Sequence, residues 1–271
     1  MLTRIITGIA ALAVFVPVLF FSHTIIFDIV IAIISLMGTL ELIFCLGVLK
    51  KYAVSVPSAV FSFIVPVFFR YIRGETVLII FIFYLFYLLY TALFLRKSVS
   101  TNDAAVCFFA AVFVTLSFTS IIAAKNQKPH GDVLYLLIFI GAWVTDTFAY
   151  FTGKIIGRHK LPLKIREVSP NKTIEGVIGG ALFCSASFSL FGFITSKTGV
   201  LSGGPDYMLF ALAGLAVSVV SILGDLSMSA IKRNYGLKDF GSIFPGHGGI
   251  LDRFDSVMAV APAVMIIGLF L

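Results

Sequence analysis

Nine apolar segments take up most of this 271-residue chain and limit what it can fold into. An α-helix needs roughly 17 to 25 apolar residues to cross a bilayer, and in lipid only helices or closed barrels satisfy every backbone hydrogen bond. We therefore expect an all-α, polytopic integral membrane protein with about nine transmembrane helices. The segments are 5–21, 25–49, 54–69, 76–95, 104–123, 133–152, 174–196, 207–231 and 254–271. The third is the weakest, because it is short and contains Pro57 and Pro66.

The composition agrees with a membrane location. Hydrophobic residues make up 59% of the chain and charged residues only 12%, about half their share in soluble globular domains. The first segment follows Arg4 and lacks a small-residue cleavage site, so we expect a retained helix and not a signal peptide.

The basic residues predict the orientation, because short cytoplasmic loops retain positive charge. With nine spans, 15 of the 20 Lys and Arg residues fall on the side of the N-terminus. We therefore expect a cytoplasmic N-terminus and an external C-terminus. Both long polar loops, 153–173 and 232–253, then face the cytoplasm.

The two halves of the chain differ in polar content. Residues 1–125 have short connections and few polar groups, which indicates a scaffold of N-terminal transmembrane helices. Asp28 and Glu41 are acids within or near its apolar segments, and each is either functional or paired with another helix or the interface. Residues 126–271 carry the polar clusters, so we expect a C-terminal catalytic region within one continuous membrane domain.

Asp225 lies deep in the eighth segment, and Ser229 and Lys232 follow it on the same helical face. A carboxylate in hydrocarbon is costly unless it has a cation partner or faces a wet cavity. Because Lys232 is too far along the helix to pair closely, a bound metal ion is the expected partner. A neutral, hydrogen-bonded acid is the alternative.

Asp252 and Asp255 stand three residues apart where the ninth segment begins. If helical, they present two oxygen ligands on one face, which suits Mg²⁺ with substrate phosphate oxygens as further ligands. Acids that merely cap the helix are the alternative.

The turn at 245–249 surrounds His247 with glycines. Exposed backbone N–H groups in such a turn bind anions, although a plain tight turn has the same composition. His247 is a candidate hydrogen-bond donor to phosphate, or an acid or base.

The other cytoplasmic loop is strongly basic. Lys160, Lys164 and Arg166 fit an anchor for anionic headgroups. Lys172, Thr173 and Glu175 form a mixed-polarity cluster that opens the seventh segment, which favours phosphate or nucleotide contact.

Four blocks of these residues resemble the signature of the CDP-diacylglycerol synthases, also called phosphatidate cytidylyltransferases. The resemblance covers residues 141–257 and extends to the N-terminal half only by hydropathy. Two positions depart from the pattern, since many members have lysine at Asn171 and glutamate at Met228. The longest block is Ser229-x-Ile231-Lys232-Arg233, Lys238-Asp239-x-Gly241 and Phe244-Pro245-x-His247-Gly248-Gly249-Ile250-x-Asp252-Arg253-Phe254-Asp255. The others are Asp146-x-x-Ala149-Tyr150-x-x-Gly153-Lys154-x-x-Gly157-Arg158, Ser169-Pro170-x-Lys172-Thr173-x-Glu175-Gly176 and Gly224-Asp225-Leu226.

The resemblance implies that CTP and phosphatidic acid react to give CDP-diacylglycerol and pyrophosphate with Mg²⁺ as cofactor. The implied ligands of one or two metal ions are Asp146, Asp225, Asp252 and Asp255. The implied cations around the lipid phosphate and pyrophosphate are Lys232, Arg233, Lys238 and Arg253. The implied contacts to the nucleotide are Lys172, Thr173, Glu175, His247, Gly248 and Gly249.

The partners expected from this reaction are CTP and phosphatidic acid in the membrane, with no nucleic acid. The sequence is compatible with a homodimer. We expect a multi-pass protein of a bacterial cytoplasmic membrane, with a cavity open to the cytoplasm and the inner leaflet.

Three other functions are weighed against this one. An ion-coupled secondary transporter also uses intramembrane acids, but it needs a site reachable from both faces. A CDP-alcohol phosphotransferase uses an acidic motif with glycine after its second aspartate, whereas Ser256 follows Asp255 here. A non-catalytic lipid-binding protein is the third alternative.

Overall fold

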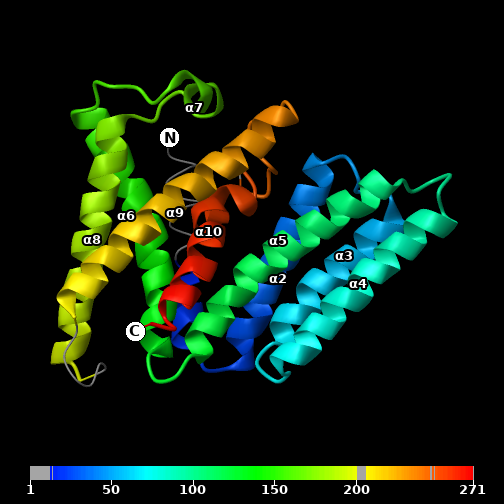
Figure 1. The fold of residues 1–271 in the computed structure, drawn as a ribbon, viewed down its shortest axis with the longest axis horizontal. Coiled ribbons are helices and arrows are strands. Elements are labelled where there is room, and N and C mark those ends of the chain that lie inside the picture. The colour runs from blue at the N-terminus through cyan, green and yellow to red at the C-terminus, as the bar shows by residue number, and fades with distance from the viewer. Residues whose placement is uncertain (1–12, 14, 200–205, 245, 247, 271) are drawn as a thin grey trace. The chain divides into compact units, whose positions relative to one another are not determined.

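The computed structural model describes residues 13, 15–199, 206–244, 246 and 248–270, and among these the regular elements are all α-helices (Figure 1). Six described helices are long and apolar enough to cross a membrane, which confirms an all-α polytopic membrane protein. They are α2 (Ile25–Cys45), α4 (Gly74–Phe94), α5 (Thr101–Asn126), α6 (Gly131–Ile155), α8 (Ile174–Lys197) and α9 (Tyr207–Asn234).

Three described helices are shorter: α3 (Tyr52–Phe68), α7 (Leu163–Val168) and α10 (Leu251–Ile267). Of these, α3 is predominantly apolar, and α10 has only 17 residues and carries charged side chains in its first turn. The number of nine spans and the orientation stay predictions. Most of the first expected segment, 5–21, lies outside the described residues.

The chain divides into two compact units, which we describe separately. The N-terminal unit consists of Met1–Ala123 and Tyr235–Phe254, and the C-terminal unit of Ala124–Asn234 and Asp255–Leu271. The polar segment that follows α9 therefore belongs to the N-terminal unit.

Within the N-terminal unit, α3 packs between α2 and α4. Pro57 has no N–H to donate to the carbonyl of Ala53, and the Tyr87 hydroxyl of α4 donates to that carbonyl instead, at 2.9 Å. The Ser58 hydroxyl lies 2.6 Å from the Tyr84 hydroxyl, and the Tyr84 ring stacks on Phe61. These contacts from α4 support the helix around Pro57.

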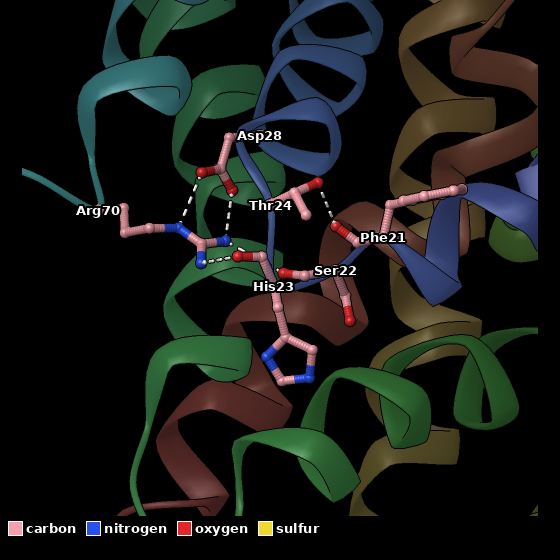
Figure 2. Close-up of polar contacts among 6 residues, drawn as sticks. All are labelled: Phe21, Ser22, His23, Thr24, Asp28 and Arg70. Carbon is pink, nitrogen blue, oxygen red and sulfur yellow. Dashed lines mark hydrogen bonds and ion pairs between the residues drawn. The ribbon is translucent and has the colours of Figure 1, made fainter.

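An ion pair joins α2 to the end of α3 (Figure 2). The Arg70 guanidinium donates to both carboxylate oxygens of Asp28, at 2.8 and 2.9 Å. It also donates to the backbone carbonyls of Ser22 and His23, at 3.1 and 3.2 Å. Asp28 is fully buried, and its cation partner lies in the turn that follows α3.

Within the C-terminal unit, α8 packs against both α6 and α9. Glycines allow α6 and α8 to approach closely: a Cβ on Gly176 would lie 2.7 Å from the Ala149 carbonyl oxygen. A Cβ on Gly180 would lie 2.8 Å from the Thr145 carbonyl oxygen. Small residues at such crossings are typical of membrane helices. This crossing brings the C-terminal end of α6 beside the N-terminal end of α8.

Candidate active site

A cavity of about 680 Å³ lies in the C-terminal unit, where the C-terminal end of α6 meets the N-terminal end of α8. Its lining includes the acids Asp146, Asp225 and Asp255 and the bases Lys154, Lys160 and Lys172. Gly153, Gly157 and Gly176 leave part of the wall without side chains. The structure therefore brings five of the predicted site residues to one cavity: Asp146, Lys172, Thr173, Asp225 and Asp255.

Asp225 has a protein cation as its partner in this cavity. The Nζ atom of Lys172 lies 2.7 Å from Asp225 Oδ2. Ser229, one turn along α9, donates its hydroxyl to Asp225 Oδ1 at 3.3 Å, which confirms the shared helical face. Lys172 thus fills the place next to Asp225 for which the sequence suggested a metal ion.

Asp146 and Asp255 complete the acidic group. The Ser256 hydroxyl donates to Asp146 Oδ2 at 2.7 Å, and the Ser256 backbone N–H donates to Asp255 Oδ1 at 2.9 Å. The negative charges of Asp146, Asp225 and Asp255 repel one another. The positive charges of Lys172 and Lys232 offset part of this repulsion. Ser256 was not singled out from the sequence, although it directly follows Asp255.

The chemistry of this group fits a hard divalent cation, because carboxylate oxygens are the ligands that Mg²⁺ prefers. Three carboxylates line one cavity and repel one another, so a cation between them would be stabilised. Within the described part of the chain, no three His, Cys, Asp or Glu side chains are already arranged as a metal-binding set. The metal-binding role of Asp146, Asp225, Asp252 and Asp255 stays a prediction.

The loop before α8 folds back on the start of that helix. Thr173 caps α8, since its side-chain oxygen accepts the Gly176 N–H at 3.1 Å. Glu175 accepts the backbone N–H of His159 at 3.1 Å, and its Oε1 lies 2.6 Å from His159 Nδ1. Thr173 lines the cavity, whereas Glu175 does not. The contacts of Glu175 with His159 hold the loop that carries Lys160.

The glycine-rich turn lies in the N-terminal unit and is held by a carboxylate of its own. Asp252 Oδ2 accepts the backbone N–H groups of Phe240 and Gly249, at 2.8 and 2.9 Å. Gly248 has φ of 79°, a conformation that side chains rarely adopt. The predicted site residue His247 lies outside the described residues.

The remaining predicted cations are not among the residues that line this cavity. Lys232 is buried near the end of α9 and Arg233 beside it is exposed. Lys238 and Arg253 are exposed residues of the N-terminal unit, which also contains Gly248 and Gly249.

Three residues of interest were not assigned to the site from the sequence. Lys154 and Lys160 line the cavity. Gly153 and Gly157, which flank Lys154 four residues apart, are the sequence feature that could have indicated a site at this lysine. Glu41 accepts hydrogen bonds from the backbone of Ile250 and Leu251. No sequence pattern connects it to that turn.

Comparison with known proteins finds one protein family and several relatives. The chain matches the Cytidylyltransferase family over residues 2–271. It is 33% identical to the phosphatidate cytidylyltransferase of Staphylococcus haemolyticus (strain JCSC1435), covering 98% of both chains. It is 32% identical to the phosphatidate cytidylyltransferase of Bacillus subtilis (strain 168), over 96% of this chain and 94% of that one. A protein of the same name from Staphylococcus aureus (strain COL) is 41% identical over 64% of this chain and 62% of its own. The chain belongs to the cytidylyltransferase family.

Proposed function

We propose that this protein is a phosphatidate cytidylyltransferase, which transfers CMP from CTP to phosphatidic acid and forms CDP-diacylglycerol and pyrophosphate. Two relatives with this name, from Staphylococcus haemolyticus and Bacillus subtilis, align with nearly the whole chain. The observation that carries the proposal is the cavity of the C-terminal unit, in which three carboxylates and three lysines face the same space. Such a site suits two polyanionic substrates and a cation.

In the reaction, an oxygen of the phosphatidate phosphate forms a bond to the α-phosphorus of CTP. The bond from that phosphorus to the bridging oxygen breaks, and its electron pair leaves with pyrophosphate. A phosphomonoester is already ionised near neutral pH, with a second pKa of about 6, so the attack needs no general base. The protein's task is to hold two anions together and to stabilise the charge of the leaving group.

Lys154, Lys160 and Lys172 are placed to neutralise substrate phosphates, because all three line the cavity. Asp146, Asp225 and Asp255 would hold the metal ion, with Ser256 and Ser229 orienting two of these carboxylates. Mg²⁺ held there would supply positive charge that offsets the negative charge of the phosphates.

The proposal includes a location and partners. Positive charge in loop 153–173 supports a cavity on the cytoplasmic side, where CTP is found, within reach of phosphatidate in the inner leaflet. Nucleic acid has no role in this reaction, and a homodimer is compatible with the chain. The family match gives no support to the alternative of an ion-coupled transporter.

The direct test uses the purified protein in detergent with phosphatidate, Mg²⁺ and CTP labelled in the α-phosphate. The wild-type protein should convert the label to CDP-diacylglycerol and release pyrophosphate. Asp225→Asn and Asp255→Asn should each lower the rate by about 10²- to 10³-fold or more, because each removes a charge of the proposed metal site.

Asp206→Asn is the matched control for Asp225→Asn. Asp206 precedes α9 and accepts the backbone N–H groups of Met208 and Leu209, a capping role that asparagine also fulfils. This variant should keep wild-type activity. Full activity in both Asp225→Asn and Asp255→Asn would refute the assigned site, and a wild-type protein that makes no CDP-diacylglycerol would refute the function.

A further inference from the structure

Glu41 of α2 binds the backbone at the start of α10, which lies 209 residues further along the chain. Its Oε1 accepts the Ile250 N–H at 2.8 Å and its Oε2 accepts the Leu251 N–H at 2.9 Å. The side chain is buried, with only 7% of its surface exposed. The first N–H groups of a helix have no partner within the helix, and a carboxylate is a favourable acceptor for them.

Two glycines make room for this carboxylate. A Cβ on Gly241 would lie 2.6 Å from Glu41 Oε1. A Cβ on Gly249 would lie 2.5 Å from the carboxyl carbon of Glu41. Neither position admits a larger residue while Glu41 stays where it is. Gly241 and Gly249 therefore fit the approach of a protein carboxylate, which is a specific reason for glycine at both positions.

Two carboxylates together hold four backbone donors in and around the glycine-rich turn 245–249. Glu41 takes the N–H groups of Ile250 and Leu251, and Asp252 takes those of Phe240 and Gly249. The sequence suggested that N–H groups of this turn bind substrate phosphate. Of these four donors only Gly249 lies within that turn, and its N–H is engaged by Asp252.

We infer that Glu41 is a positioning residue for the proposed cytidylyl transfer. It fixes the first turn of α10, which carries Asp252, and Asp255 follows one turn later on the same helix. This inference rests on the proposed function, since Asp255 matters only if the cavity is catalytic. Glu41 does not line the cavity and acts through α10.

The test compares Glu41→Gln with wild-type protein by hydrogen exchange and by kinetics. Glutamine offers one acceptor oxygen in place of two, so exchange at Ile250 or Leu251 should become about tenfold faster or more. The maximal rate should fall about 10- to 100-fold, because small displacements of catalytic groups have effects of this size. The Mg²⁺ concentration for half-maximal rate should also rise, whereas a mere loss of folded protein would leave it unchanged.

Glu75→Gln is the matched control, because Glu75 is an exposed glutamate in the first turn of α4. It should match wild type in exchange, rate and Mg²⁺ requirement. Glu41→Asp keeps the charge but shortens the side chain, so it should fold and fall between wild type and Glu41→Gln in all three measurements. It also serves if Glu41→Gln does not fold.

Two outcomes would overturn the inference while the wild-type enzyme remains active. One is unchanged exchange at Ile250 and Leu251 in both Glu41 variants. The other is faster exchange with wild-type rate and Mg²⁺ requirement, which would make Glu41 purely structural. An inactive wild-type protein would instead refute the proposed function, so the two failures are distinguishable.

Discussion

Lys172 and Asp225 form an ion pair of 2.7 Å in the cavity of the C-terminal unit. Their side chains are 22% and 28% exposed, so the pair is accessible to solvent and to ligands. A cation that binds Asp225 competes with Lys172 for the same carboxylate oxygen. Lys172 would then be released toward the phosphates of the substrate, which links cation binding to nucleotide binding.

Replacement of Lys172 by glutamine should therefore separate stability from activity. A partly exposed pair contributes at most about 1 kcal/mol, so the free energy of unfolding of Lys172→Gln should differ little from wild type. The rate of CMP transfer should fall about 10²-fold or more, because a charge that stabilises the phosphates is lost. Thermal unfolding and the CTP assay measure the two effects.

The competition makes a second prediction, measured without CTP. Mg²⁺ should raise the unfolding temperature of Lys172→Gln more than that of wild type, because the ion no longer displaces a lysine. Lys50→Gln, at an exposed lysine of the N-terminal unit, should respond to Mg²⁺ as wild type does. An equal or smaller shift in Lys172→Gln would show that the lysine does not compete with the ion.

Much of the fold is predictable because the membrane leaves so few alternatives for the backbone. The apolar segment 76–95 corresponds to α4 (Gly74–Phe94), and 174–196 corresponds to α8 (Ile174–Lys197). Helical periodicity also predicted that Ser229 lies beside Asp225. Such features depend on local spacing, which a sequence displays directly.

Contacts between distant segments could not be predicted in this way. Glu41 and Ile250 are separated by 209 residues, and no local pattern in α2 indicates which N–H groups its carboxylate meets. Glu175 accepts the backbone N–H of His159, 16 residues earlier in the chain, and no local spacing indicates that contact. Asp225 of α9 likewise pairs with Lys172 from the loop before α8, and no local spacing connects these two residues.

The ion pair between Arg70 and Asp28 should matter for stability and not for chemistry (Figure 2). Removing one partner of a buried pair costs about 3 to 5 kcal/mol, because the other charge remains buried. Arg70→Ala should therefore lower the midpoint temperature of thermal inactivation. At low temperature, the activity per folded molecule should change little. Arg70→Lys should restore it only in part, since lysine cannot donate to both carboxylate oxygens as arginine does.

Arg73→Ala is the control for this effect, because Arg73 is exposed and only three residues away. It should unfold at the wild-type temperature. If Arg70→Ala unfolds there too, the pair contributes nothing measurable.

The crossing of α6 and α8 should not tolerate a larger residue at Gly176. A methyl group there would meet the backbone carbonyl of Ala149, which cannot rotate away. We expect Gly176→Ala to destabilise the protein by about 1 to 3 kcal/mol, as overpacking usually does. Gly74→Ala is the matched control, since nothing lies within 4 Å of a Cβ at that position. Equal thermal stability of the two variants would contradict close packing at this crossing.

Cysteine labelling can test the predicted orientation, because the native cysteines Cys45, Cys107 and Cys184 are all buried. Lys164 in α7 and Arg73 before α4 are exposed positions on loops that should face opposite sides of the membrane. The rule that positive charge is retained in cytoplasmic loops predicts that Arg73 lies on the external side. A membrane-impermeant maleimide should therefore label Arg73→Cys in intact cells. It should label Lys164→Cys only in inverted vesicles. Labelling of Lys164→Cys in intact cells would place its loop outside, away from cytoplasmic CTP, and the proposed access of the nucleotide would then be wrong.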